Sequence, residues 1–320
     1  MAFNPSHFSN STLIWRDYLG IARLNHWFKN IFVLPGTALA ILLTGSPLRD
    51  ALGPTIVALL ATGFLASANY VLNEWLDAKS DKHHPLKQHR PGANGRLRPQ
   101  LVMLEYLLLA STGLLLANTL TIQFLYIAVV FLCMGAIYNV PPLRSKDRAF
   151  LDVLSESINN PLRLLLGWSA LVNGILPPSS IMLAYWMGGA FLMAVKRYAE
   201  YRYIGDPARA AMYRKSFGQY TEKSLLLSAF FYALSAAFFL GIFLIKYRVE
   251  FLVSFPFFAL LFAWYLAIGM QPDSAAQHPE KLHRNGSFVA YTVFLVFLVI
   301  LLFFIDIPIL DIFVNKVNFN

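Results

Sequence analysis

Residues 52–81 read LGPTIVALLATGFLASANYVLNEWLDAKSD, an apolar run that ends in regularly spaced polar residues. No charged side chain occurs within 52–73. A transmembrane helix needs about 20 consecutive apolar residues, so this run is long enough to cross a bilayer. In hydrocarbon every backbone group must be paired within the segment, which requires a helix rather than an open strand. The stretch therefore predicts a membrane-spanning helix with polar residues at one end.

Comparable apolar runs recur along the chain of 320 residues. Hydrophobic residues make up 57% of it and charged residues 13%, whereas about a quarter of the residues of soluble domains are charged. The runs lie at about 28–45, 52–73, 101–118, 121–141, 150–174, 179–199, 225–245, 249–269 and 287–310. We predict an all-α polytopic membrane bundle of about nine transmembrane helices. It forms a single domain, 1–320, which begins with a polar segment, 1–22.

The positive charge is concentrated on one side of the predicted bundle. The net charge is +9, and 21 of the 26 Lys and Arg residues lie on one side: before the first run, after an even-numbered run, or, for Lys29, Lys196 and Arg197, within the end of a run next to these segments. Loops rich in Lys and Arg stay in the cytoplasm. We therefore expect a multi-pass protein of the cell (inner, cytoplasmic) membrane with a cytoplasmic amino terminus. A basic rim that only fixes topology and contacts anionic lipid headgroups is the alternative.

The strongest local pattern is Asn73-x-x-x-Asp77-x-x-x-Asp81. This spacing places an amide and two carboxylates on one helical face. Such oxygen ligands suit Mg²⁺, which takes one or two protein carboxylates and shares its other positions with water and substrate phosphates. Lys87 and Arg90 follow, where they can contact an anion held by the metal. The alternative is a helix end with solvated acids.

A second group of polar residues surrounds the fourth loop and the fifth run. Tyr138 and Lys146 flank a Pro-Pro break that suits a loop over a cavity. Asp152, Glu156 and Arg163 are spaced by four and seven residues, so they are expected to share a face of one helix. That face can bind substrate or form an internal ion-pair network.

The third group is Lys196-Arg197 with Glu200, at the end of the sixth run. These residues can clamp a phosphate, although Lys196 and Glu200 can also pair with each other at a spacing of four. Lys29 adds a cation beside Trp27, and a Trp at this position can equally be an interfacial anchor.

Several other classes of protein lack support in the sequence. There is one cysteine, Cys133, which excludes a disulfide scaffold. The adjacent pair His83-His84 faces different directions on any helix and has no Cys or third His to complete a zinc site. Motifs for nucleotide hydrolysis and acyl transfer are absent. No nucleic-acid partner is expected.

The element Asn73-x-x-x-Asp77-x-x-x-Asp81, after the second predicted helix, resembles the aspartate motif of the UbiA-type intramembrane prenyltransferase superfamily. Further stretches are similar to its decaprenyl-phosphate phosphoribosyltransferase branch: Trp27-Phe28-Lys29-Asn30, His84-Pro85-x-Lys87-x-x-Arg90-Pro91, Lys196-Arg197-Tyr198-Ala199-Glu200, and the series Tyr138, Lys146, Asp152 and Arg163. Glu74 departs from the Asp usual in the branch. Lys196-x-x-x-Glu200 replaces the second Asp-x-x-x-Asp of the aromatic prenyltransferases.

The resemblance implies a UbiA-like bundle and a Mg²⁺-dependent transferase. Its substrates would be phosphoribosyl diphosphate and a polyprenyl phosphate lipid, joined at the cytoplasmic membrane face. Asn73, Asp77 and Asp81 would hold the metal, and the other site residues would bind the two anions. The alternative is transfer of a polyprenyl group from its diphosphate to an aromatic or other acceptor. A lipid or ion carrier is a further alternative, but its ionisable residues are expected at mid-bilayer, whereas these cluster near one face.

Overall fold

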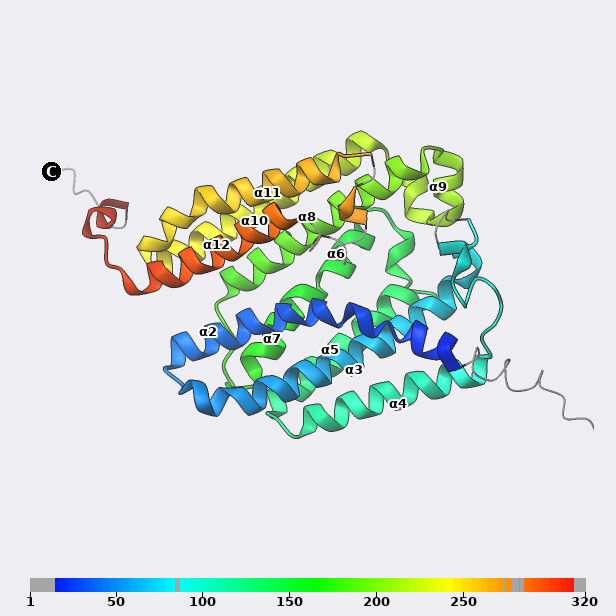
Figure 1. Ribbon diagram of the computed structural model, residues 1–320, viewed down its shortest axis with the longest axis horizontal. Helices are drawn as coiled ribbons and strands as arrows, with labels where there is room; N and C mark the ends of the chain where they lie inside the picture. The colour runs from blue at the N-terminus through cyan, green and yellow to red at the C-terminus, as the bar shows by residue number, and fades with distance from the viewer. Residues whose placement is uncertain (1–14, 84–86, 273, 278–281, 283–284, 314–320) are drawn as a thin grey trace, which may run out of the picture. The chain divides into compact units, whose positions relative to one another are not determined.

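The computed structural model describes residues 15–83, 87–272, 274–277, 282 and 285–313 (Figure 1). Residues 1–14 of the predicted amino-terminal segment and the motif residues His84 and Pro85 lie outside the described residues. All regular structure in the described part is helical, which confirms the predicted fold class. The chain divides into two compact units, one formed by Met1–Pro177 with Ile204–Tyr220 and the other by Pro178–Tyr203 with Thr221–Asn320.

The first unit contains the polar end of the long helix α3. Its elements are η1 (Leu24–Val33), α2 (Leu34–Thr44), α3 (Leu48–Asp81), η2 (Lys87–His89), α4 (Pro99–Asn118), α5 (Ile122–Asn139), η3 (Ser145–Asp147), α6 (Leu151–Ser157), α7 (Asn159–Ser169), α9 (Pro207–Tyr213) and η4 (Lys215–Gln219). The second unit holds α8 (Ser179–Ile204), α10 (Glu222–Tyr247), η5 (Val249–Ser254), α11 (Phe255–Gly269), η6 (Ala275–Gln277), α12 (Gly286–Phe304) and η8 (Pro308–Phe313).

Eight segments of the described residues are long and apolar enough to cross a membrane, so the chain is an integral multi-pass membrane protein. They are Trp15–Thr44, Leu48–Asp81, Pro99–Asn118, Ile122–Asn139, Ser179–Ile204, Glu222–Tyr247, Val249–Gly269 and Gly286–Phe304. The fifth predicted span, 150–174, is not among them because it is divided at Ile158 into the shorter helices α6 and α7. Pro161 has no N–H to donate and therefore stands in the first turn of α7.

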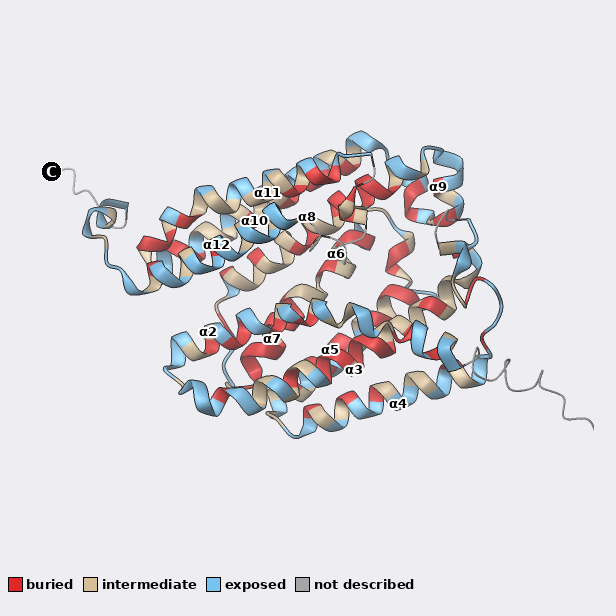
Figure 2. Cartoon of the chain, in the orientation of Figure 1, coloured by how far each residue is buried: buried red, intermediate tan, exposed pale blue. Residues whose placement is uncertain are grey.

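Helix α3 forms the core of the first unit (Figure 2). Ala58, Ala61 and Leu65 on this helix are buried against Phe124 and Phe131 of α5. Small residues on a membrane helix let neighbouring backbones approach closely, which replaces the hydrophobic driving force that lipid does not supply. The core thus fixes α3, whose last turns carry the predicted metal ligands.

Helices α2 and α7 come into close backbone contact at two glycines, Gly36 and Gly167. A Cβ atom added to Gly36 would lie 1.9 Å from the Leu164 carbonyl oxygen, and one added to Gly167 would lie 1.9 Å from that of Val33. The Thr37 hydroxyl also donates to the Gly167 carbonyl at 3.3 Å. No larger residue fits at this crossing without separating the backbones.

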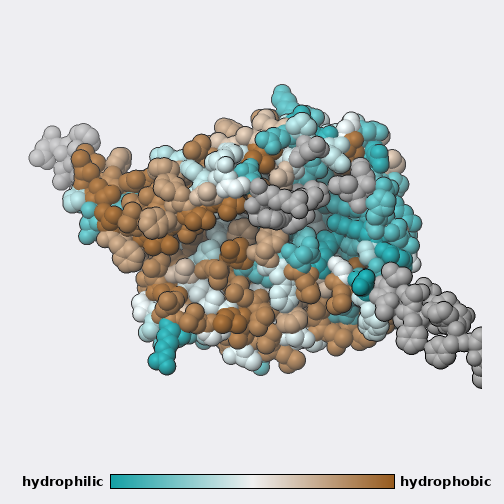
Figure 3. Space-filling view, in the orientation of Figure 1, coloured by the Kyte–Doolittle hydropathy of each residue, from teal (hydrophilic) through white to brown (hydrophobic). Residues whose placement is uncertain are grey.

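The second unit packs aromatic side chains between its helices. Phe191 of α8 contacts Phe262 and Tyr265 of α11, with ring centroids 4.9 and 5.9 Å apart. The outer face of α12 instead carries exposed apolar side chains, including Val293 and Phe297 (Figure 3). Such a face is expected where a helix meets lipid tails.

The α2–α7 crossing yields a stability prediction. Gly36→Ala and Gly167→Ala should each destabilise the protein by about 1–3 kcal/mol, because the added methyl group overlaps a backbone carbonyl oxygen. The measurement is the apparent midpoint of thermal unfolding in detergent. Gly53→Ala is the control, since a Cβ atom there meets nothing within 4 Å. Equal midpoints for all three variants would contradict the close crossing.

Candidate functional site

The last turns of α3 present the three predicted metal ligands, and the helix ends at Asp81. The Asn73 amide donates to Asn139 Oδ1 at the end of α5, at 2.5 Å. Asp77 and Asp81 lie close enough to repel each other electrostatically. An amide and two carboxylates thus follow one another along successive turns, as the spacing predicts.

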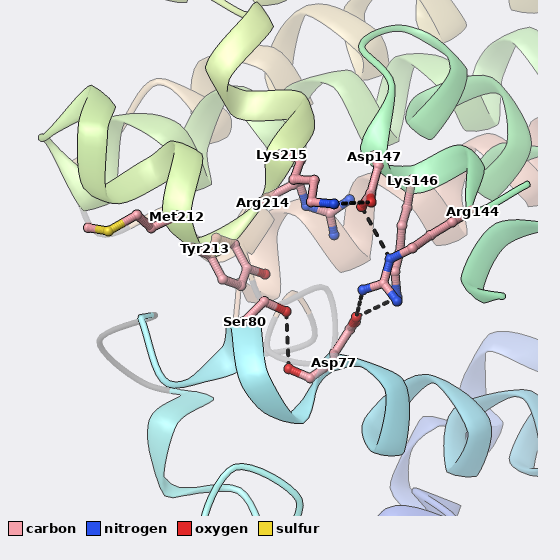
Figure 4. Close-up of a pocket in the computed structure, with 9 residues that line it drawn as sticks. All are labelled: Asp77, Ser80, Arg144, Lys146, Asp147, Met212, Tyr213, Arg214 and Lys215. Carbon is pink, nitrogen blue, oxygen red and sulfur yellow. Dashed lines mark hydrogen bonds and ion pairs between the residues drawn. The ribbon is translucent and has the colours of Figure 1, made fainter. Parts of the chain in front are cut away.

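Asp77 receives two cations from the loop after α5 (Figure 4). Its Oδ1 atom lies 2.5 Å from Lys146 Nζ and 3.1 Å from Arg144 Nη2. Lys146 also donates to Asn139 Oδ1 at 2.7 Å. The Asn139 amide therefore links Asn73 to Lys146, and one polar network joins the ends of α3 and α5.

Lys146 is a buried cation, with 4% of its surface exposed. Burial lowers the pKa of its ammonium group from 10.5 to about 8, against the opposing attraction of Asp77. A lysine held in this way has already lost most of its hydration shell, so binding an anion would carry little further desolvation cost.

A small cavity of about 90 Å³ lies beside Asp77. Its lining consists of Asp77, Ser80, Arg144, Lys146, Asp147, Met212, Tyr213, Arg214 and Lys215. Figure 4 shows Asp77 on α3 facing Arg144, Lys146 and Asp147, with Arg214 and Lys215 on a further wall. Cations thus surround the acidic helix end on two sides.

Asp152 holds the wall that carries Arg214 and Lys215. Its carboxylate is fully buried and accepts hydrogen bonds from Ser216 Oγ at 3.1 Å and the Tyr220 hydroxyl at 2.7 Å. Arg214 Nη1 lies 3.6 Å from the same carboxylate. In the described structure Asp152 therefore fixes η4 to α6, which supports a positioning role.

Asp152 and Glu156 both lie on α6, whereas Arg163 lies on α7 beyond the break at Ile158, so the three residues do not belong to one continuous helix as expected. Glu156 accepts a hydrogen bond from the Tyr138 hydroxyl at 2.7 Å. Arg163, in α7, is 7% exposed and lies over the Phe131 ring, 5.2 Å from its centroid. No carboxylate within the described residues forms an ion pair with Arg163. The alternative of an ion-pair network among the three therefore also fails.

Lys87 and Arg90 lie next to the end of α3, as predicted. Arg90 Nη1 is 2.8 Å from Asp81 Oδ2 and 3.8 Å from Glu74 Oε2. Lys87 donates to the Tyr213 hydroxyl and lies over that ring. Glu74 is buried and pairs with Arg23 at 2.5 Å. The glutamate found here in place of the usual aspartate therefore forms an ion pair with the residue that precedes η1.

The remaining predicted site residues do not line this cavity. Lys29 lies in η1, where the neighbouring Trp27 donates to Ser67 Oγ at 2.9 Å. Arg197, on α8 in the second unit, is 1% exposed and pairs with Glu200 at 3.4 Å. Lys196 also lies on α8, and the roles of these three α8 residues stay predictions.

The donor set fits Mg²⁺ better than a softer metal. Among the described residues no group of three or more His, Cys, Asp or Glu side chains is placed to hold a metal ion. Two carboxylates and an amide are all-oxygen ligands, which suits a cation that keeps several waters and takes others from phosphate. The ion pairs of Asp77 and Asp81 with lysine and arginine would have to give way to such a cation.

Several residues of the cavity were not among the predicted site residues. They include Arg144, Asp147, Tyr213, Arg214 and Lys215. The charged ones stand in the basic loops on the predicted cytoplasmic side of the bundle. Asn139, which contacts Lys146 but does not line the cavity, was not predicted either. Asn139 follows an apolar run and gives no charge signal, although it joins Asn73 and Lys146.

The chain is similar in sequence to known membrane transferases. The chain is 29% identical to the decaprenyl-phosphate phosphoribosyltransferase of Mycobacterium tuberculosis over 213 residues, 63% of this chain and 65% of that protein. It is 26% identical to the protoheme IX farnesyltransferase of Alkalihalophilus pseudofirmus over 198 residues, 60% of this chain and 63% of that protein. The chain thus spans less than two thirds of the length of either relative.

The fold has a counterpart among solved structures. A UbiA homolog from Archaeoglobus fulgidus bound to DMAPP and Mg²⁺ matches with a TM-score of 0.65 and 18% identity, covering 88% of this chain and 99% of that one. The model of the UbiA prenyltransferase family matches residues 33–285. The family resemblance is thereby confirmed, and the chain belongs to the UbiA prenyltransferase family.

Proposed function

We propose that this protein transfers a phosphoribosyl group from phosphoribosyl diphosphate to a polyprenyl phosphate, with Mg²⁺, at the cytoplasmic face of the cell membrane. The observation that carries the proposal is the cavity in which Asp77 at the end of α3 meets Lys146 and Arg144. The cavity thus brings acidic residues that can bind a metal close to cations that can bind phosphates. The mycobacterial phosphoribosyltransferases, 29–30% identical, support the choice of donor.

Both substrates demand a site where water meets the bilayer. The donor is a soluble polyanion, and the acceptor is a lipid with an anionic head. The cavity lies at the polar end of a membrane-spanning helix, and its basic residues belong to the loops that we predict to be cytoplasmic. A charged substrate therefore does not need to enter the hydrocarbon, where an unpaired charge is costly.

The chain's own residues can bind and orient the reacting groups. Asn73, Asp77 and Asp81 would hold Mg²⁺, which when bound neutralises charge that develops on the diphosphate leaving group. Lys146 and Arg144 exchange their contact with Asp77 for a substrate phosphate. One charge pair at about 4 Å is worth roughly 4 kcal/mol at an effective dielectric of 20, so bringing two polyanions together requires several such contacts.

The reaction needs no strong general base. An oxygen of the lipid phosphate forms a bond to C1 of the ribose, and the bond from C1 to the diphosphate oxygen breaks. The acceptor phosphate is already an anion at neutral pH, so no proton has to be removed from it. The buried carboxylate of Asp152, which holds η4, fits a positioning role in this scheme.

Prenyl transfer from a polyprenyl diphosphate is the second candidate function. It is favoured by the protoheme IX farnesyltransferases, 26% identical, and by the likeness to a homolog bound to DMAPP. The same metal face can bind the diphosphate of either donor. The acceptor and the transferred group separate the two functions.

The first prediction for this function concerns the product. Membranes containing the protein, incubated with Mg²⁺, radiolabelled phosphoribosyl diphosphate and a polyprenyl phosphate, should transfer label to the lipid fraction. The product mass should correspond to the lipid phosphate plus one phosphoribosyl group. Chelation of the metal should abolish transfer, and added Mg²⁺ should restore it. Unlabelled lipid, with prenylation of an aromatic acceptor instead, would favour the second candidate.

The second prediction concerns the acidic face. Asp77→Asn should lower kcat by at least about a hundredfold, because it removes a charged oxygen ligand needed while negative charge develops. Asp50→Asn, an exposed site in the first turn of the same helix, is the matched control and should keep wild-type turnover. Steady-state kinetics on purified protein measures both. Equal activity of the two variants would remove Asp77 from the mechanism.

A further inference from the structure

The cavity beside Asp77 contains two carboxylates separated by one arginine. Arg144 Nη2 lies 3.1 Å from Asp77 Oδ1, and Arg144 Nε lies 3.3 Å from Asp147 Oδ1. Lys146 contacts Asp77 from its own side, and Lys215 Nζ lies 3.3 Å from Asp147 Oδ2. Each carboxylate is thus held by two cations, and Arg144 is common to both. The cavity therefore has two adjacent positions that suit an anion.

The backbone that carries Lys215 is firmly anchored. Ser216 and Tyr220 in and after η4 bind the buried Asp152, and the Tyr220 hydroxyl also accepts from the Phe150 N–H at 2.5 Å. Gln219 accepts from the Ala149 N–H at 3.3 Å. The Lys215 side chain itself is 78% exposed. Because the backbone at Lys215 is already fixed, its accessible ammonium group can bind a soluble anion without a large loss of backbone conformational entropy.

We propose that Lys215 and Arg144 form a subsite for a phosphomonoester, the 5-phosphate of the donor. Asp147 occupies the position of this phosphate when the donor is absent and keeps the two cations from repelling each other. This inference rests on the proposed function, and it assigns one phosphate group of the donor to each of the two anion positions in the cavity. The diphosphate belongs at Asp77, beside the acids suited to the metal, and the monoester belongs at Asp147.

The charge of the subsite favours a phosphate over Asp147. A phosphomonoester carries up to two negative charges and three acceptor oxygens, whereas Asp147 offers one charge and two oxygens. Arg144 can bind a phosphate with two parallel N–H donors, and Lys215 adds a mobile point charge. Asp147 is partly exposed, so it can turn towards water when displaced.

The subsite separates the two candidate functions. Phosphoribosyl diphosphate carries anionic groups at both ends of a sugar, so it can occupy both positions. A polyprenyl diphosphate has one anionic end and an apolar tail, which the cations at Asp147 do not suit. Lys215 should therefore influence binding of a sugar phosphate and have little influence on binding of a diphosphate alone.

Direct binding to the full-length protein tests the proposal. Purified protein in detergent with Mg²⁺ is titrated calorimetrically with ribose 5-phosphate, with ribose and with inorganic diphosphate. Lys215→Ala should raise the Kd for ribose 5-phosphate about tenfold, because it removes a charge-assisted hydrogen bond to the phosphate. The Kd for inorganic diphosphate should not change. Lys215→Arg should restore most of the affinity for ribose 5-phosphate because it keeps the positive charge.

Lys223→Ala is the matched control, since it removes another exposed lysine outside the cavity. It should leave all three affinities at their wild-type values. The proposal is overturned if wild-type protein binds ribose 5-phosphate no better than ribose. It is also overturned if Lys215→Ala weakens diphosphate and ribose 5-phosphate equally, or changes neither.

The outcome is separable from that of the proposed function. Transfer of label to lipid together with a Kd that does not depend on Lys215 would retain the function and reject the subsite. Binding of ribose 5-phosphate that depends on Lys215, without any transfer to lipid, would retain the subsite and reject the function.

Discussion

The ion pair between Asp77 and Lys146 is the interaction on which the site depends. It joins residues 69 positions apart in the chain and brings a buried lysine to the end of a membrane-spanning helix. A buried charge is tolerated only when it is paired and hydrogen-bonded, and Lys146 satisfies this requirement through Asp77 and Asn139. The loop after α5 consequently folds back on α3, and Arg144 and Asp147 come with it. This pair thus places one wall of the cavity, whereas Asp152 holds the other wall.

The sequence predicts those features of the fold and the site that depend on neighbouring residues. The apolar run that becomes α3 and the four-residue spacing of Asn73, Asp77 and Asp81 depend only on helical periodicity, so both follow from a reading of neighbouring residues. Family membership likewise follows from these motifs. The contacts of Asp77 with Lys146 and Arg144 join distant positions, and no local pattern specifies them. The break between α6 and α7 at Ile158 was not predicted, because the apolar residues of 150–174 continue on both sides of it.

The ion pairs around Glu74 show a second limit of sequence reasoning. At the level of motif, Glu74 is a mild exchange for an aspartate. In the structure it is a buried carboxylate between Arg23 and Arg90, and Arg90 in turn contacts Asp81. The longer side chain therefore belongs to a chain of charges that runs from η1 to the last residue of α3. Similarly, Glu200 pairs with Arg197, because a spacing of three places side chains on one helical face as well as a spacing of four does.

The first compact unit is built from two stretches of chain, with α8 between them in the sequence. Asp77, Arg144 and Lys146 belong to the first stretch, whereas Arg214 and Lys215 belong to the second. During synthesis a ribosome makes α8 before it makes the second wall of the cavity. Lys146 and Arg144, which pair with Asp77, precede α8 in the sequence, whereas Arg214, Lys215 and the anchoring residue Tyr220 follow it. All residues that line the cavity are therefore synthesised before helices α10, α11 and α12 of the second unit.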